Sequence, residues 1–429
     1  MRRSLSIALL LLFMFKGLAE SEELPATHEH LPEHHLIASG SGTKGGSRGS
    51  TKAATPTHRT GIQHKARKAS GNISPATGNK AGEQPAANPV FAEMDKTLAA
   101  VMQLYNVPGL AVAITKNGQP VFEGNYGYAN KETGETVNSQ SRFRIASLSK
   151  PITSAGILKL VQDGKLQLTD KVFGPEGILR DDFPTPPAGS NIDQITIQDL
   201  LSHKSGWTNN KSGDPMLGDY TLTAQQVITQ EVLSHPLDHA PGTTYHYSNL
   251  GYSILGRVIE KVSGKDYTTF IKEEILLPAG ITGMQIGGDT EQQRAPHEVK
   301  YYQGEYNPYT YNMSRMDAHG GWIATPSELL RFMTLIDRNS SVPDLIDSDV
   351  LETTYFGSYS WSHYGSLPGT TAVLTRLNDE YSFVALANTR NNAFPELLAE
   401  ELNNTMQALV QLLEDWPTDN TLLAEKQTP

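Results

Sequence analysis

The stretch FRIASLSKPI, residues 143–152, carries a serine and a lysine three positions apart, Ser147 and Lys150. The apolar residues that follow recur at helical spacing as far as Val161, and Pro151 is tolerated in the first turn of a helix. We therefore expect a helix that opens with this pair, so that both side chains lie on one face. A lysine buried near the positive end of a helix has a lowered pKa and can take the proton of a serine hydroxyl. The stretch thus predicts serine acyl-transfer chemistry.

The first 19 residues have the pattern of a secretory signal peptide. Arg2 and Arg3 precede an apolar run over residues 7–15, and residues 17–19, Gly-Leu-Ala, offer a small-x-small cleavage site. The run is too short to span a membrane, and no later run is long and apolar enough to do so. The chain has no cysteine, which excludes disulfides and lipid-modified cysteines. We expect a secreted or periplasmic protein.

Residues 20–88 are rich in Ser, Thr, Gly, Lys, Pro and Ala, which predicts a disordered linker. Residues 1–88 carry 11 Lys and Arg against 6 Asp and Glu, so the formal charge of −11 for the whole chain leaves −16 for the rest. Such an acidic globule argues against nucleic acid as a partner. The apolar patterns predict one domain over residues 89–416, followed by a flexible tail at 417–429.

Strands are expected at both ends of this domain and helices between them. Asn117-Gly118 separates two apolar runs, which is a strong signal for a β-hairpin. An antiparallel sheet completed by this N-terminal hairpin, with a helical insertion, is therefore the predicted α+β architecture. The expected helices lie at 91–105, 152–161, 195–201, 224–233, 250–262, 267–276, 326–336 and 394–413, and the expected strands at 110–114, 121–128, 359–364, 371–377 and 381–387.

Three other matches to catalytic motifs lack the surrounding structure that such chemistry needs. Ser41 and Lys44 repeat the Ser-x-x-Lys spacing, but they lie in the predicted linker. Residues 45–49, Gly-Gly-Ser-Arg-Gly, match a nucleophile elbow, yet no strand leads into them. Tyr128-Ala129-Asn130 matches a Tyr-x-Asn motif, but it ends the early hairpin. We expect no catalytic role for any of them.

The remaining motifs occur in a fixed order along the domain. Ser147 and Lys150 come first, Tyr247-Ser248-Asn249 follows in a loop between Pro241-Gly242 and a helix, and His363-Tyr364-Gly365 lies near the end of a strand just before Ser366. This set resembles the serine β-lactamase and penicillin-binding-protein superfamily, in particular its branch of class C β-lactamases, D-aminopeptidases and related esterases. Further similar stretches are residues 199–206, 241–252 and 320–325, and the resemblance runs from about Phe91 to Leu413.

The resemblance implies the β-lactamase/transpeptidase-like fold, with an antiparallel sheet flanked by helices and a mostly helical subdomain. It implies that Ser147 is acylated, that Lys150 is its general base and that Tyr247 relays a proton to the leaving group. Asn249 would bind the acyl-side amide of the substrate or the lysine. The backbone N–H groups of Ser147 and Ser366 would form the oxyanion hole. No cofactor or metal is implied.

The third motif departs from the pattern of the superfamily. Its β-lactamases and D-Ala-D-Ala peptidases carry Lys-Thr/Ser-Gly there, whereas this chain has His363, Tyr364 and Gly365, which would still supply a strand edge for substrate. The loss of the fixed charge favours an esterase or an amidase over a penicillin hydrolase. Arg390 follows the last strand and could supply a replacement cation or could be a solvated loop residue, just as His363 could be structural.

Two hypotheses from other classes remain to be weighed. A catalytically silent binding protein on the same scaffold would be favoured by loss of Ser147, Lys150 or Tyr247, and all three are present. The only motif that would indicate a metal-dependent hydrolase is the spacing of His30 and His34. Pro32 lies between them, so no helix aligns the two side chains. We expect a small-molecule ester, amide or peptide as substrate; the sequence does not identify it, nor the oligomeric state.

Overall fold

The computed structural model of the protein describes residues 89–209 and 213–412. The expected signal peptide at 1–19, the linker at 20–88 and the tail at 417–429 lie outside the described residues, as does the predicted domain end at 416. Among the described residues, no helix combines the length and the hydropathy needed to cross a membrane.

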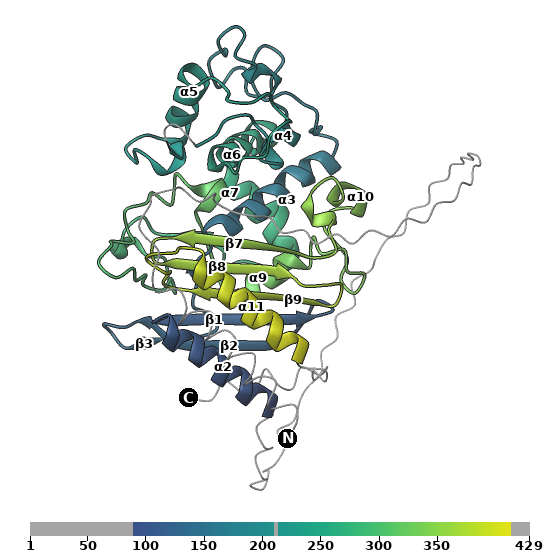
Figure 1. The fold of residues 1–429 in the computed structure, drawn as a ribbon. Coiled ribbons are helices and arrows are strands. Elements are labelled where there is room, and N and C mark those ends of the chain that lie inside the picture. Colours follow the sequence, from purple (N-terminus) through teal and green to yellow (C-terminus); the bar gives the residue numbers. More distant parts are fainter. Residues whose placement is uncertain (1–88, 210–212, 413–429) are drawn as a thin grey trace, which may run out of the picture. The chain divides into compact units, whose positions relative to one another are not determined.

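A six-stranded antiparallel sheet forms the centre of the described domain (Figure 1). Its strand order is β3-β2-β1-β9-β8-β7, so the N-terminal hairpin joins the C-terminal strands where β1 pairs with β9. This confirms the predicted sheet and its completion by the first hairpin. The strands are β1 Gly109–Lys116, β2 Gln119–Asn130, β3 Glu135–Thr136, β7 Trp361–Leu367, β8 Thr370–Arg376 and β9 Tyr381–Ala387.

The turn between β1 and β2 shows why this hairpin could be predicted. Asn117 and Gly118 both have positive φ, 51° and 71°. Two successive residues in this region are needed for the tight turn whose twist matches that of antiparallel strands, and Asn-Gly adopts it at low cost.

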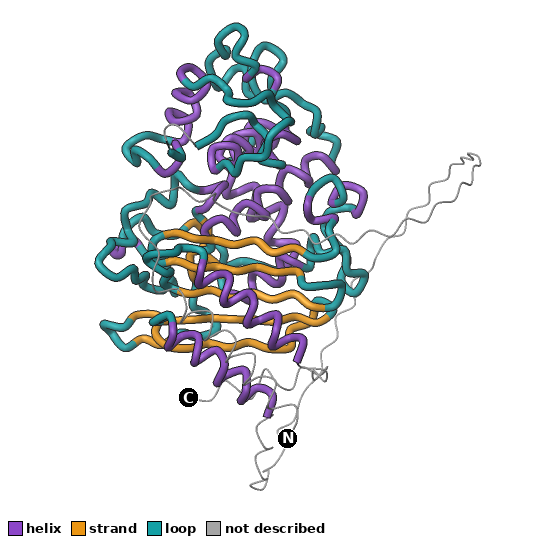
Figure 2. The backbone as a smooth tube through the Cα atoms, viewed as in Figure 1, coloured by secondary structure: helices purple, strands orange, loops and turns teal. Residues whose placement is uncertain are grey.

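Both faces of the sheet are covered, which gives two hydrophobic clusters. The helices α2 (Pro89–Leu104) and α11 (Leu397–Leu412) cross one face, and Leu110, Val112 and Val373 point toward them. The opposite face carries Ala111 and Leu374, which pack into the larger cluster shared with the other helices. Figures 1 and 2 show α2 and α11 along the sheet and the helical region beyond its β7 edge. Because both faces of the sheet are covered, β1 is almost entirely buried and does not alternate between buried and exposed residues.

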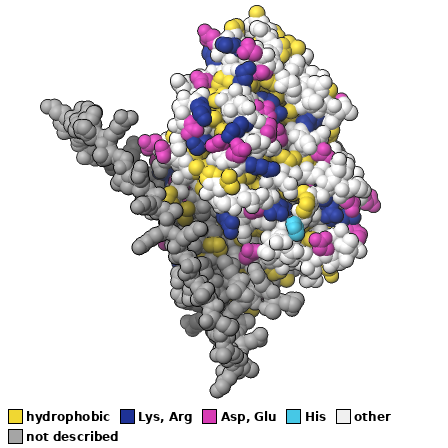
Figure 3. All heavy atoms as spheres, turned by 180° about the vertical axis from the view of Figure 1, so that it is seen from behind, with side chains coloured by type: hydrophobic (Ala, Val, Ile, Leu, Met, Phe, Trp, Pro, Cys, Tyr) yellow, Lys and Arg dark blue, Asp and Glu magenta, His cyan; other side chains and the backbone are white. Residues whose placement is uncertain are grey.

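The helical region and a small second sheet make up the rest of the domain. The second sheet has the order β4-β6-β5, from Phe143–Arg144, Trp322–Ala324 and Gln285–Ile286. The α-helices here are α3 Ser149–Gln162, α4 Ile197–Leu201, α5 Ala224–Ser234, α6 Asn249–Ser263, α7 Tyr267–Phe270, α8 Asp317–Gly320, α9 Pro326–Met333 and α10 Ser348–Leu351. On the face shown in Figure 3, acidic and basic side chains lie interspersed.

Several observed elements differ from the prediction. β7 runs from Trp361 to Leu367 instead of 359–364, so Ser366 lies within the strand and not after it. The helix expected at 267–276 divides into α7 and a π-helical segment, Ile271–Leu276. The short helix α8 was not predicted, because four residues are too few for a periodic pattern.

Candidate active site

Ser147 lies on a tight turn between β4 and α3. It is the middle residue of a 3₁₀ turn, Ala146–Leu148, and α3 begins two residues later, at Ser149. The expected single helix is therefore a 3₁₀ turn that continues into an α-helix. Ala146 has a φ of 47°, which is uncommon for a residue with a side chain. Strained backbone of this kind next to a buried hydroxyl marks a candidate functional site.

The predicted catalytic side chains meet at the Ser147 hydroxyl. The Tyr247 hydroxyl donates to Ser147 Oγ at 2.7 Å, and Lys150 Nζ lies 3.2 Å from the same oxygen. Tyr247 arrives from a loop a hundred residues away in sequence. All three side chains are nearly or fully buried, with exposed fractions of 9% for Ser147, 6% for Tyr247 and 0% for Lys150. The arrangement therefore offers a hydroxyl between two groups that can each carry a proton.

Lys150 has two further partners that hold its Nζ atom in place. Nζ donates to Asn249 Oδ1 at 2.6 Å and to the backbone oxygen of His319 at 2.9 Å. Nζ also lies 4.6 Å from the centre of the Tyr247 ring. Of the two roles expected for Asn249, the contact with the lysine is present.

Tyr247 is held by the ring of His203. The two rings stack with centroids 4.7 Å apart, and His203 Nδ1 accepts from the Ser248 backbone N–H at 3.1 Å. Burial raises the pKa of Tyr247 well above its usual value of 10, although the bond to Ser147 opposes this effect. Tyr247 is therefore a protonated phenol at neutral pH and can donate a proton. His203 belongs to the motif at 199–206, but the sequence alone did not assign it a role.

The strand β7 approaches the nucleophile turn closely. A Cβ atom on Gly365 would lie 2.2 Å from the backbone oxygen of Ile145, so only glycine fits at this crossing. Gly365 and His363 share one face of the strand with Ala372 and Leu374 opposite them. His363 is buried there, with its ring 6.1 Å from that of Tyr355.

Tyr364 points to the other face of the sheet. It packs with the cluster formed by α2 and α11, and its pKa is raised by burial and by Glu400 of α11. The alternation of side chains along a strand requires this, since Gly365 and His363 face the nucleophile turn. The structure therefore does not bring the Tyr364 side chain into the site with Ser147.

Arg390 lies beside Ser366 at the end of β7. Arg390 Nη1 donates to Ser366 Oγ at 3.3 Å. Burial lowers the pKa of Arg390, and Tyr311 and Glu396 oppose this effect, so the guanidinium remains charged. The structure thus places Arg390 half-buried beside Ser366, and its role as a replacement cation stays a prediction.

Asp214 is a functional candidate that the sequence analysis missed. Asp214 Oδ2 accepts from Asn249 Nδ2 at 2.6 Å. Burial raises the pKa of Asp214, and the bonds from Met216 and Asn249 together with the charge of Lys150 oppose the shift. A lone aspartate in a polar loop has no sequence signal, because its partner is 35 residues away.

His319 lies next to Lys150 in a position where it cannot carry charge. Its exposed fraction is 1%, and neither ring nitrogen has a hydrogen-bond partner among the described residues. Burial, followed by the charges of Lys150, Arg315 and Arg257, lowers the pKa of His319 well below 6.5. His319 directly precedes the stretch 320–325 noted in the sequence, but the sequence analysis did not single it out.

The neutral His319 predicts a pH-dependent loss of stability that one substitution should reduce. In the unfolded chain the pKa of the imidazole lies near its usual value of about 6.5, so below about pH 6 the unfolded state binds one more proton than the native state. Stability therefore falls as the pH drops, by about 1.4 kcal/mol per pH unit from this group. We expect His319→Leu to lose less unfolding free energy between pH 6.5 and pH 5 than the wild type.

Chemical denaturation at a series of pH values measures this difference. His239→Leu is the matched control, because His239 is exposed. Other buried groups titrate as well, but they are common to both proteins and cancel in the comparison. Identical pH slopes for the wild type and the His319 variant would contradict the neutral state of His319.

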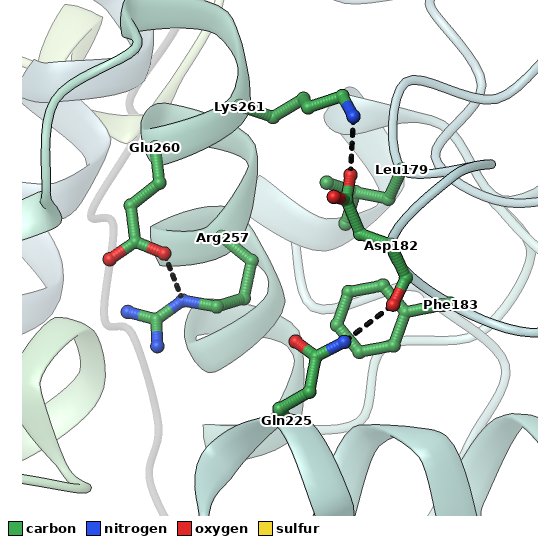
Figure 4. Close-up of a pocket in the computed structure, with 7 residues that line it drawn as sticks. All are labelled: Leu179, Asp182, Phe183, Gln225, Arg257, Glu260 and Lys261. Carbon is green, nitrogen blue, oxygen red and sulfur yellow. Dashed lines mark hydrogen bonds and ion pairs between the residues drawn. The ribbon is translucent and has the colours of Figure 1, made fainter.

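A cavity of about 480 Å³ lies away from these residues. It is lined by Leu179, Asp182, Phe183, Gln225, Arg257, Glu260 and Lys261 (Figure 4). Lys261 pairs with Asp182 at 2.8 Å and Arg257 with Glu260 at 3.0 Å. The charges around this cavity neutralise one another and tie α6 to the loop at 179–183. None of the predicted site residues lines it.

Comparison with known proteins places the chain among relatives of one fold. The model of the Beta-lactamase family matches residues 94–403. Protein flp of Staphylococcus aureus (strain N315) is 26% identical over 336 residues, which cover 72% of this chain and 65% of that protein. This chain therefore spans less than two thirds of the length of that relative.

Solved structures agree with the match of the family model. The D-amino acid amidase of Ochrobactrum anthropi SV3, complexed with L-phenylalanine amide, superposes with a TM-score of 0.61 at 20% identity and covers 76% of this chain and 99% of its own. A class C β-lactamase superposes with a TM-score of 0.60 at 20% identity, covering 77% of this chain and 98% of its own. At such identities the likeness concerns the fold, and the fold is the one that the sequence predicted. With the family model matching most of the described domain, the chain belongs to the Beta-lactamase family, whose neighbours of known structure include hydrolases.

Proposed function

We propose that the protein is an exported serine hydrolase that forms an acyl-enzyme on Ser147. The observation that carries the proposal is the pair of bonds at one hydroxyl, from Tyr247 at 2.7 Å and with Lys150 at 3.2 Å. A nucleophile, a base and a proton donor within hydrogen-bond reach are what acyl transfer requires. The proposed export rests on the N-terminal pattern of residues 1–19.

In the proposed reaction, Lys150 takes the Ser147 proton as Oγ bonds to the carbonyl carbon of an ester or amide. The negative charge that develops on the carbonyl oxygen is stabilised by the backbone N–H groups of Ser147 and Ser366. Tyr247 gives its proton to the departing alcohol or amine and recovers one from Lys150. A water molecule then attacks the acyl-enzyme, with its proton passing back through the same groups, and releases the acid and free Ser147.

The residues at the strand edge beside Ser147 favour substrates that have no carboxylate group. His363 occupies the place of the lysine in β-lactamases and D-Ala-D-Ala peptidases, and the side chain of Tyr364 packs on the far face. Met313, Met316 and Leu367 form a buried apolar cluster with Ala146, next to the nucleophile. An ester or an amide with an apolar substituent suits such surroundings better than a dianionic or strongly acidic substrate.

The second candidate is a β-lactamase or a D-Ala-D-Ala carboxypeptidase. The position of Arg390 favours it, because its guanidinium lies at Ser366 and could pair with a substrate carboxylate. A D-amino acid amidase is among the structural neighbours, so amides of D-amino acids belong in the same comparison. A silent binding protein on this scaffold would react with none of these compounds.

A substrate panel tests the proposal. We expect kcat/KM for p-nitrophenyl butyrate to exceed that for nitrocefin by at least tenfold, because no lysine pairs with the nitrocefin carboxylate. His363→Lys should raise the nitrocefin value relative to the ester by about fivefold, since one charge pair contributes roughly 1 kcal/mol. Tyr364 is left unchanged in this variant because it packs against α2 and α11.

Arg390→Gln separates the two candidate functions. Efficient nitrocefin hydrolysis by the wild type that is lost in Arg390→Gln but kept in Arg331→Gln would establish the β-lactamase alternative. Arg331 is a suitable control because it is exposed on α9. D-phenylalanine amide completes the panel. The absence of turnover with every compound, together with no labelling by a fluorophosphonate, would leave the silent binding protein.

A further inference from the structure

Asp214 is linked to the proposed general base, Lys150, through the side chain of Asn249. It lies immediately before the 3₁₀ turn Pro215–Leu217, in a loop that Arg315 holds by donating to the backbone oxygens of Met216, Asp219 and Leu222. Asp214 Oδ1 accepts from the Met216 N–H at 2.9 Å, and Oδ2 accepts from Asn249 Nδ2 at 2.6 Å. Its two carboxylate oxygens thus serve two different parts of the fold.

The bond to Asn249 determines how that amide is oriented. Both Asp214 oxygens accept hydrogen bonds, Oδ1 from the Met216 N–H and Oδ2 from Asn249 Nδ2, so the group that Asn249 turns toward Asp214 is its NH₂. The carbonyl oxygen of the amide is then directed at Lys150, and Oδ1 lies 2.6 Å from Nζ. Without Asp214, either end of the amide could face the lysine, and an NH₂ group there would offer a donor where Lys150 needs an acceptor.

The orientation of Asn249 matters because of the number of donors on Lys150. A neutral amine has two N–H groups and one lone pair. Asn249 Oδ1 and the His319 backbone oxygen supply two fixed acceptors for the two N–H groups. The lone pair can then face Ser147 Oγ, which lies 3.2 Å from Nζ and whose proton has to be removed.

We propose that Asp214 is a positioning residue that aims the lone pair of Lys150 at Ser147 by fixing the orientation of the Asn249 amide. The inference rests on the proposed function, because it assigns Asp214 a part in the deprotonation of Ser147. It also extends the site beyond the three motifs to a loop that none of them includes.

A purely structural role is the competing explanation, because Asp214 also caps the 3₁₀ turn. Serine distinguishes the two roles. Its hydroxyl can accept from the Met216 N–H as a capping residue does, but it is too short to reach Asn249 as well. A capping role alone therefore predicts that Asp214→Ser resembles the wild type, whereas a positioning role predicts slower turnover.

The experiment measures kcat and KM for p-nitrophenyl butyrate in Asp214→Ser, Asn249→Ala and the double variant. We expect Asp214→Ser to lower kcat roughly 10- to 100-fold with little change in KM, since a positioned general base contributes about 10²–10⁴. Because Asp214 acts through Asn249, the same change should have little further effect in the Asn249→Ala background. Asp266→Ser is the matched control, an aspartate that caps α7 away from the site.

The outcomes separate this inference from the proposed function. A wild-type kcat in Asp214→Ser would overturn the positioning role. So would a double variant whose loss of kcat equals the product of the two single losses. The proposed function would stand in either case as long as Ser147→Ala is inactive. Activity in Ser147→Ala would overturn the proposed function itself. Thermal unfolding of each variant checks that it folds, and Asp214→Thr, which also caps but does not reach Asn249, replaces Asp214→Ser should the latter not fold.

Discussion

Replacing Ser147 with alanine is expected to abolish covalent labelling by a fluorophosphonate and to lower kcat for p-nitrophenyl butyrate by a factor on the order of 10⁴ or more. The hydroxyl oxygen is the atom that would bond to the acyl group, and it lies within hydrogen-bond distance of both Lys150 and Tyr247. Stability should change by only about 1 kcal/mol, because the substitution removes one oxygen and its hydrogen bonds. Mass spectrometry of the labelled peptide identifies the modified residue.

The control for Ser147→Ala is the same substitution at Ser41, which lies three residues before Lys44 just as Ser147 lies three residues before Lys150. The Ser41→Ala variant should be labelled by the fluorophosphonate and should hydrolyse p-nitrophenyl butyrate like the wild type. A labelled peptide that contains Ser41 instead of Ser147, or a fully active Ser147→Ala variant, would contradict the acyl-enzyme proposal.

The parts of this molecule that could be predicted are those with local signals. Asn117-Gly118 favours a tight turn, and the apolar runs on either side of it pair as strands. The Ser-x-x-Lys spacing places Ser147 and Lys150 together through three residues of helical backbone. The family motifs then pointed to Tyr247, which the fold brings to Ser147 from a hundred residues away.

The parts that could not be predicted depend on register and on distant contacts. Strand β7 was expected to end at Tyr364, and its true extent to Leu367 decides which side chains face the nucleophile. The alternation along that strand sends Tyr364 to the α11 side, which a motif match does not reveal. Asp214 contacts Asn249 through its side-chain carboxylate and His319 contacts Lys150 through its backbone oxygen, and neither contact has a pattern in the sequence.

Lys150→Ala and Tyr247→Phe are each expected to lower kcat for p-nitrophenyl butyrate by several orders of magnitude, roughly 10²–10⁴ each. Lys150→Ala removes the proposed acceptor of the serine proton, and Tyr247→Phe removes the hydroxyl that donates to Ser147 at 2.7 Å while it keeps the ring. The phenylalanine ring can still stack on His203, so the loop that carries residue 247 should remain in place.

The double variant decides whether these two side chains act as one unit. In the proposed reaction a single proton leaves Ser147 for Lys150 and reaches the leaving group through Tyr247, so the loss of either group interrupts the same path. The combined variant should therefore be little worse than the worse single variant, as for other catalytic groups that act together. Losses that multiply would mean that Lys150 and Tyr247 contribute to separate steps, and the relay would then have to be replaced by two independent proton transfers. Tyr267→Phe is the matched control, because Tyr267 is also fully buried and hydrogen-bonded to α3, at Thr153, but does not contact Ser147.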